Sequence, residues 1–362
     1  MKKNILLILA MSLTFCSCSQ ENTIENTTES ISENTGGTTV YETGQTAEEQ
    51  VFTGIPEKDI EYGFSPQVNK NDFSLQLFCY DGNGNIYFSD PGDNYSLYAY
   101  DGSESSKLTD IKAIGLNYYD SKIYFVSPQR EIDIEDMVFP EGYAYVYDLQ
   151  SGETTQIGDS RMCNMTVIDG EIYAINNDNA CFFYKYDEND PDCRNKKIFN
   201  SFVIKKCKDR FFTFESVSVN NEDKINFYLQ NDADKQFILA DDIALDCCFS
   251  FGKLYYKSQN THELKTIDLK TGETNNLGYA SEFTLLDGEL YVLKENGYLY
   301  KIGNENKLND LNQFYDIYSD NVNLYGVTGE YNMALQRPEY SFVKINPDFS
   351  VEIISKKGED KQ

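Results

Sequence analysis

The fold of this chain is decided by a short stretch that recurs along it and first reads Asp81-Gly82-Asn83-Gly84-Asn85-Ile86-Tyr87-Phe88. In each copy, a turn rich in Asp, Gly or Asn leads into an aliphatic and aromatic strand. Asp-Gly and Asn-Gly supply the positive-φ residues of tight hairpins, and alternating Ile, Tyr and Phe suit β-strands. Six further copies begin at Asp120, Asp169, Asp209, Gly252, Asp287 and Asn321.

A second pattern follows most copies and predicts another strand, as in Leu97-Tyr98-Ala99-Tyr100-Asp101. The main aromatic positions of successive copies lie 34 to 49 residues apart, at Tyr87, Tyr124, Tyr173, Phe212, Tyr255, Tyr291 and Tyr325. Repeats of about 40 residues with four short strands each are typical of propeller blades. The sequence therefore predicts an all-β fold, a single β-propeller over residues 73–357 with seven four-stranded blades, or with six or eight as alternatives.

The N-terminus begins with two lysines, continues with an apolar run over residues 5–15, and then reads Cys16-Ser17-Cys18. The apolar run is too short to span roughly 30 Å of hydrocarbon and is typical of a secretion signal. A cysteine at its end resembles the lipobox of bacterial lipoproteins, in which the thiol is acylated. We predict a signal peptide over residues 1–17 and an acylated Cys18, which follows a small serine, with Cys16 as the alternative.

With an acylated Cys18, we expect the chain to be anchored in a bacterial cell membrane and to face away from the cytoplasm. Residues 18–50 are mainly Ser, Thr, Glu, Asn and Gly, and they cannot bury enough apolar surface to offset the entropy of ordering. We expect this segment to be a lipidated, disordered tether. Residues 51–72 form a lead-in segment that is a candidate closing strand for the last blade, and residues 358–362 form a charged tail.

The first repeat carries a recognisable motif. Tyr87-Phe88-Ser89-Asp90 resembles the Tyr-Trp-Thr-Asp strand of low-density-lipoprotein-receptor-type propellers, and Asp101-Gly102-Ser103 with Lys107-Leu108-Thr109-Asp110 completes that unit. The region from about residue 73 to 357 is similar to a family of bacterial lipoproteins that carry such a propeller and have no assigned function. Receptor propellers of this type have six blades, and the later repeats here keep only parts of the motif. The resemblance therefore implies a fold and leaves the ligand open.

Composition and charge narrow the classes of function. With 31 basic and 59 acidic side chains the net charge is −28, and this field repels the phosphates of nucleic acid, so we expect no nucleic-acid partner. The single histidine, His262, excludes a His-rich zinc site, and no Cys-x-x-Cys pair occurs. Two acidic segments, 81–85 and 187–192, carry oxygen ligands of the kind that calcium uses. We assign no metal residue and expect no cofactor, with calcium as the open alternative.

Two long connections mark a candidate binding face. Residues 126–142 of the second repeat and residues 327–339 of the seventh predict long loops, and these repeats flank the first one in a closed ring. Long loops on a rigid scaffold often carry function, and apolar side chains with arginine suit a protein partner. The candidate binding residues are Arg130, Met137, Phe139, Tyr331, Met333, Leu335 and Arg337.

Two functions follow from these observations. The favoured one is a non-enzymatic, surface-tethered propeller that binds a protein or glycan through one loop face; the oligomeric state is left open. The alternative is a carboxylate- or calcium-dependent hydrolase or lyase whose site lies in the propeller channel. That alternative needs polar side chains from several inner strands to converge, and the candidates are Asn117, Asp246 and Asp316.

Overall fold

A computed structural model of the 362-residue chain describes residues 76–355. Its gaps are 135–136, 176–182, 191–192, 194–196, 200–203, 208–209, 220–221, 231–234, 239–246, 251, 259–260, 262, 269, 305–312, 321 and 334–336. The predictions for the signal peptide, for Cys16 and Cys18, for the tether and for the lead-in segment lie outside the described residues. No described helix is long and apolar enough to cross a membrane.

The described residues form seven antiparallel sheets, in which strands adjacent in sequence are adjacent in the sheet. Sheet one contains β1 (Phe78–Tyr80), β2 (Ile86–Asp90), the 3-10 helix η1 (Pro91–Asp93), β3 (Ser96–Tyr100) and β4 (Ser105–Lys112). Sheet two contains β5 (Ile114–Tyr119), β6 (Lys122–Ile134), β7 (Met137–Asp148) and β8 (Thr154–Met162). Sheet three contains β9 (Asn164–Ile168), β10 (Glu171–Ile175), β11 (Phe183–Lys185) and β12 (Lys197–Phe199).

The other four sheets follow in chain order. Sheet four contains β13 (Ile204–Cys207), β14 (Arg210–Val219), β15 (Glu222–Gln230) and β16 (Lys235–Ile238). Sheet five contains β17 (Cys247–Ser250), β18 (Lys253–Lys257), β19 (Glu263–Asp268) and β20 (Thr274–Tyr279). Sheet six contains β21 (Glu282–Leu286), β22 (Glu289–Leu293) and β23 (Leu299–Lys301), and sheet seven contains β24 (Phe314–Ser319), β25 (Leu324–Asn332), β26 (Arg337–Ile345) and β27 (Val351–Ile353).

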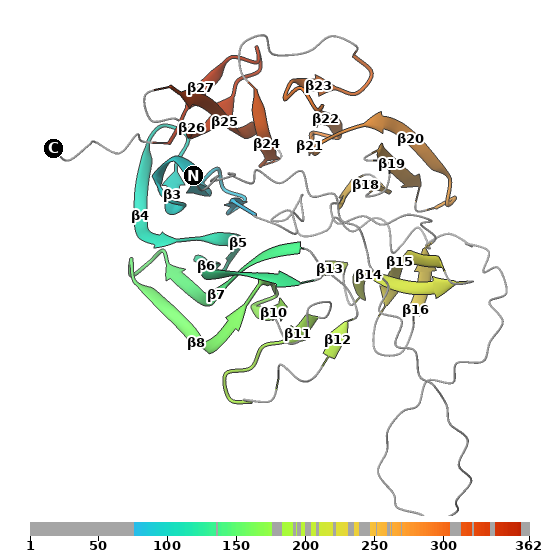
Figure 1. Cartoon of the computed structure of the whole chain (residues 1–362), viewed down its shortest axis with the longest axis horizontal. Helices are drawn as coiled ribbons and strands as arrows, with labels where there is room; N and C mark the ends of the chain where they lie inside the picture. Colours follow the sequence, from blue (N-terminus) through green and yellow to red (C-terminus); the bar gives the residue numbers. More distant parts are fainter. Residues whose placement is uncertain are drawn as a thin grey trace, which may run out of the picture.

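The sheets are arranged around a common centre, so the described part of the chain is a β-propeller (Figure 1). Each of the seven predicted repeats coincides with one sheet, and the recurring turn joins the first strand of that sheet to the second. The turns have the expected conformation: Gly82, Asp120 and Asp169 all have positive φ. The all-β propeller predicted from the repeats is confirmed.

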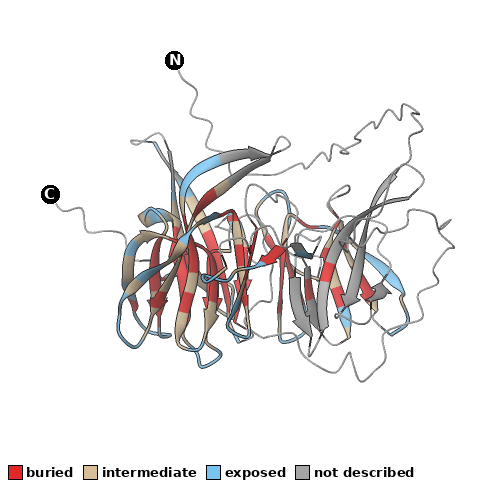
Figure 2. Ribbon diagram, turned by 90° about the horizontal axis from the view of Figure 1, so that it is seen from below, coloured by how far each residue is buried: buried red, intermediate tan, exposed pale blue. Residues whose placement is uncertain are grey.

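The first and last sheets pack against each other through aromatic rings. The ring centroids of Phe78 and Tyr318 are 5.4 Å apart, and those of Phe88 and Phe342 are 4.5 Å apart. The Ser105 hydroxyl of β4 also donates a hydrogen bond to the carbonyl that follows β27. Buried residues lie along the middle of the strands, and exposed residues gather at the turns (Figure 2). The same apolar cluster includes Ile114 and Val126 of sheet two, so sheets seven, one and two share one core.

Candidate functional site

One face of the molecule, here called the hairpin face, carries the turns from the second to the third strand of each sheet and the connections between sheets. Sheets seven, one and two are neighbours at this face. The rings of Phe78 and Tyr318 join sheets one and seven, and the Leu116 amide of sheet two donates to the Gln76 carbonyl over 2.9 Å. Binding residues concentrate on such connections when a rigid scaffold holds them.

The two predicted long loops are extended hairpins, so the loop prediction for residues 126–142 and 327–339 is wrong. β6 pairs with β7 from Lys122 onward, but its pairing with β5 ends at Val126, so beyond that residue it pairs with β7 alone. β25 likewise continues beyond Thr328, where its pairing with β24 ends, and pairs with β26. Glu131-Ile132-Asp133-Ile134 explains the difference: charged and β-branched residues alternate there with the period of a strand, which the high charge disguises as a loop.

Both extended hairpins contain proline residues within their strands. Pro128 lies in β6, Pro140 lies in β7, and Pro338 lies in β26. A proline has no N–H with which to bind a further strand, and this is a common way to protect an exposed edge from pairing with another chain.

The turn of sheet one docks onto the hairpin of sheet seven. Asp90 ends β2 and caps η1, accepting a 2.9 Å hydrogen bond from the Gly92 amide at Oδ1. A Cβ atom on Gly92 would lie 2.4 Å from the Tyr340 carbonyl oxygen of β26. Only glycine allows this approach, and it fixes the turn against β26.

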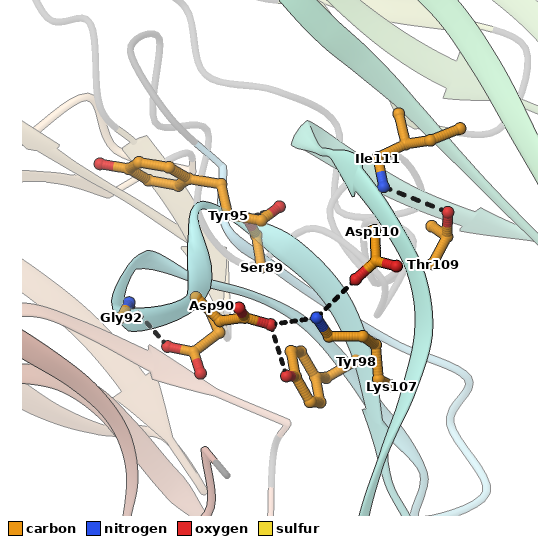
Figure 3. A network of polar contacts seen from close by, with 10 residues as sticks. Ser89, Asp90, Gly92, Tyr95, Tyr98, Lys107, Thr109, Asp110 and Ile111 are labelled. Atoms are coloured by element: carbon orange, nitrogen blue, oxygen red, sulfur yellow. Dashed lines mark hydrogen bonds and ion pairs between the residues drawn. The ribbon is translucent and has the colours of Figure 1, made fainter. Parts of the chain in front are cut away.

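A closed polar network follows this turn (Figure 3). Lys107 Nζ lies 2.5 Å from Asp93 Oδ2 and 2.7 Å from Asp110 Oδ1, and the Tyr98 hydroxyl donates to Asp93 Oδ2 over 2.6 Å. Burial raises the pKa of Asp93, but the hydrogen bonds from Lys107 and Tyr98 outweigh it and lower the pKa below its ordinary value. Lys107 and Asp110 belong to the receptor-like motif of the first repeat, and the polar atoms of this network bind one another.

Asp90 is different because it is almost fully buried, with 1% of its surface exposed. Burial raises its pKa to about 7, and the Asp93 charge adds to this shift, while the Gly92 hydrogen bond and the Lys107 charge oppose it. Asp90 therefore titrates near neutral pH within a turn of sheet one that packs against sheet seven.

A second, open polar cluster lies at the base of the β6–β7 hairpin. Glu141 of β7 is 3% exposed, and its Oε2 atom lies 2.5 Å from Arg130 Nε of β6 and 4.0 Å from Arg161 Nη1 of β8. The Arg161 guanidinium also lies 5.5 Å from the centre of the Tyr143 ring. Both arginine side chains are about half exposed, at 50% and 41%. One buried carboxylate thus holds two cations that face solvent.

The buried thiol of Cys163 lies beside this cluster and follows β8. Burial raises the pKa of Cys163 to about 12, the Glu141 charge adds to this shift, and the Arg130 charge opposes it. A thiol with such a pKa is protonated at neutral pH and is a poor nucleophile. Cys163 therefore acts here as a small core residue.

Three tyrosines form the other side of the hairpin face. The rings of Tyr315 and Tyr340 meet edge to face with centroids 5.3 Å apart, and Lys112 Nζ lies 4.9 Å from the centre of the Tyr95 ring. Among the described residues, the Tyr340 hydroxyl is buried without a hydrogen-bond partner. Burial, with smaller contributions from Tyr315 and Tyr95, raises the pKa of Tyr340 to about 12.

The sequence analysis predicted some of the residues that lie on the hairpin face and did not predict others. Arg130 joins Glu141 as described, and Met333 at the end of the β25–β26 hairpin is 80% exposed. The backbones of Met137, Phe139, Tyr331 and Arg337 lie in these hairpins, and Leu335 lies outside the described residues. Glu141, Arg161, Tyr315 and Tyr340 were not predicted. The first two could have been found as charged residues next to the connections of the second repeat.

The channel candidates use their polar atoms within the fold. The Asn117 amide of β5 donates to the carbonyls of Gly115 and Met165, over 2.8 and 3.1 Å, and its oxygen accepts from the Val167 amide. Asp316 of β24 accepts hydrogen bonds from the Ile317 amide and the Tyr318 hydroxyl. Asp246 lies outside the described residues. Asn117 therefore ties two inner strands together.

The acidic segments form turns. Asp81 Oδ1 accepts hydrogen bonds from the amides of Asn83 and Asn85, and Asp187 Oδ1 accepts one from the Asn189 amide. Within the part of the chain that the structure describes, no group of three or more His, Cys, Asp or Glu side chains is placed to hold a metal ion.

No protein-family model matches the chain, and neither does any curated protein sequence. Solved structures do resemble it. The β-propeller domain of the Trilobed protease from Pyrococcus furiosus has a TM-score of 0.42 at 10% identity, with 78% of this chain and 97% of that chain covered. Kluyveromyces lactis Hsv2 has a TM-score of 0.43 at 11% identity, with 78% and 99% covered. Pyrococcus horikoshii acylaminoacyl peptidase has a TM-score of 0.47 at 11% identity, and the match covers 82% of this chain but only 54% of the peptidase.

Proposed function

We propose that this chain is a non-enzymatic binding module: a β-propeller tethered to the outside of a bacterial cell membrane by an acylated Cys18, holding a protein or glycan partner on its hairpin face. The observation that carries the proposal is the open cluster, in which buried Glu141 presents Arg130 and Arg161 to solvent. Tyr340 and exposed Tyr315 share this face. Arginine and tyrosine are enriched in recognition surfaces, where they often supply most of the binding energy.

The location of the partner is tested by photo-crosslinking. A photoreactive amino acid replaces Met333 on the hairpin face or, as a matched control, Val322 in the turn at the opposite face; the two are 80% and 78% exposed. We expect a discrete crosslinked species in the native cells from position 333 and none from position 322. Digestion of the crosslinked partner by a protease identifies it as a protein, and digestion by a glycosidase identifies it as a glycan. Identical products from both positions, or none from either, would contradict the proposal.

The tether is tested separately, because binding and anchoring are independent. Replacing Cys18 by Ala is expected to abolish incorporation of a labelled fatty acid and to release the chain from the membrane fraction. Each buried methylene of an acyl chain contributes about 0.8 kcal/mol, so two or more chains hold a protein stably. Continued labelling of Cys18→Ala that is lost in Cys16→Ala would assign the anchor to Cys16.

A further inference from the structure

We infer that Arg130 and Arg161, here called the arginine pair, bind a carboxylate of an Asp or Glu side chain on a protein partner. This inference rests on the proposed function, because it identifies the partner that the hairpin face would hold. It follows from the charge, the geometry and the surroundings of the pair.

The arginine pair is a local exception to the charge of the chain. The sequence contains five arginines in a chain of net charge −28, and two of them lie on one glutamate. The cluster of Arg130, Arg161 and Glu141 has two positive charges and one negative charge, so it keeps a positive charge of one. The exposed Glu131 follows Arg130 directly in β6, so the attraction for an anion is confined to the guanidinium donors themselves.

The hydrogen bonds of the cluster leave donors for a ligand. Arg130 binds Glu141 through Nε, over 2.5 Å. Arg161 approaches the same oxygen at 4.0 Å, which is beyond hydrogen-bonding distance. Within the described part of the chain, the Nη groups of Arg130 and the guanidinium of Arg161 donate no hydrogen bond to protein. Guanidinium groups bind carboxylates through paired N–H donors, and that geometry remains available here.

The pair is held in place before any ligand binds. Glu141 is buried, and its strand neighbour Gly142 packs so closely on the Ser127 carbonyl that a Cβ atom would lie 1.8 Å from the oxygen. The Arg161 guanidinium also lies over the Tyr143 ring in a cation–π contact. Side chains positioned in advance lose less entropy on binding, so a weak ionic contact contributes more to affinity.

A single protein carboxylate fits better than a phosphate or an anionic lipid surface. The field of a chain with charge −28 opposes a dianion more strongly than a monoanion, and it opposes a charged membrane most of all. The Tyr143 ring beside Arg161 supplies aromatic area of the kind found in protein interfaces. The partner surface therefore combines an acidic side chain with apolar neighbours and carries a low overall negative charge.

The first test titrates the purified chain with N-acetyl-glutamate amide and, as a matched probe, N-acetyl-glutamine amide. The five arginine Nε–H signals are followed by NMR at low ionic strength. We expect the glutamate probe to shift the signals of Arg130 and Arg161 with a Kd in roughly the millimolar range, as for an exposed ion pair. The glutamine probe is expected to shift neither. Equal shifts with both probes, or tighter binding of inorganic phosphate than of the glutamate probe, would overturn the inference.

Variants connect this site to the partner. Arg161→Gln leaves Glu141 paired with Arg130, and we expect it to weaken the glutamate probe about fivefold. Lys185→Gln, which removes a similarly exposed lysine of an ion pair on β11, is the control and is expected to change nothing. Unchanged probe binding in Arg161→Gln counts against the arginine pair.

The crosslink from position 333 separates the two proposals. Its loss in Arg161→Gln, but not in Lys185→Gln, supports the carboxylate site. Its persistence in Arg161→Gln overturns the carboxylate site and leaves the proposed function standing. A glutamate probe that binds the arginine pair in a chain without any crosslinked partner would instead keep the site and remove the proposed function.

Discussion

Two charged clusters on the hairpin face lie in neighbouring sheets and differ in how their charges are used. In sheet one, Lys107 lies between Asp93 and Asp110, so the cation is held by acids on two sides. In sheet two, a single buried acid, Glu141, holds Arg130 and Arg161, and both guanidinium groups are left half exposed. The first cluster is closed and stabilises a turn. The second cluster is open and leaves guanidinium N–H donors exposed to solvent, although both clusters are built from ion pairs between basic and acidic side chains.

The largest effect is expected at the base of the open cluster. In Gly142→Ala the new Cβ atom would lie 1.8 Å from the Ser127 carbonyl oxygen, and because that atom is backbone the hairpin itself must move. We expect the free energy of unfolding to fall by about 3–5 kcal/mol. Gly92→Ala, where the Tyr340 oxygen would be 2.4 Å away, is the comparison and is expected to cost less. Urea denaturation measures the free energy of unfolding of both variants. An unchanged stability of Gly142→Ala would contradict the close packing of this hairpin.

The second prediction compares the loss of stability when the paired cation is removed from each cluster. Arg130→Met leaves buried Glu141 with only the distant Arg161, whereas Lys107→Met leaves Asp93, which is 26% exposed and hydrogen-bonded by Tyr98. An unpaired buried charge is costly, and an exposed one is not. The fall in the urea midpoint for Arg130→Met is expected to be roughly twice that for Lys107→Met or more. Equal falls would show that Glu141 is as well hydrated as Asp93.

The third prediction concerns pH and the turn of sheet one. Because burial raises the pKa of Asp90 to about 7, the folded chain binds a proton that the unfolded chain has released. The stability contributed by this group is therefore full at low pH and is lost as pH rises from roughly 4 to 7. The lowered pKa of Asp93 acts in the opposite direction, since it favours the folded state at higher pH.

Asp90→Asn isolates the contribution of Asp90, because the amide keeps an oxygen for the Gly92 N–H and does not titrate. We expect the difference in unfolding free energy between variant and parent to change by on the order of 2 kcal/mol between pH 5 and 8, in favour of the variant at pH 8. A parent and an Asp90 variant with parallel pH profiles would mean that Asp90 is ionised throughout.

The smallest effect is expected at Tyr340 of β26, which packs against the turn of sheet one. Its hydroxyl is buried without a partner among the described residues, so Tyr340→Phe removes an unsatisfied polar group while keeping the ring against Tyr315. We expect a stabilisation of at most about 1 kcal/mol, measured as a rise in the thermal midpoint. A clear loss of stability would reveal a hydrogen bond from this hydroxyl to water or to another group.

The repeats allowed the sheets to be predicted because each one is specified locally. The turn Asp81–Asn85 and the strand Ile86–Asp90 are encoded by adjacent residues, and the same is true of Asp169-Gly170 before β10. The long connection over residues 126–142 was misread because charged residues alternating with isoleucine also fit an exposed loop. Pairing with a partner strand, which sequence alone does not show, decides between the two.

The all-β propeller, the order of its strands and the position of Arg130 on a projecting connection follow from the sequence, since short-range periodicity and turn chemistry suffice for these. The tertiary structure adds that Glu141 is buried and that Arg161, from a different strand, shares it. It also decided that Asn117 is used to tie β5 to β9 and that Asp90 is shielded from water. Burial and long-range pairing depend on which strands pack together, and no local pattern records that.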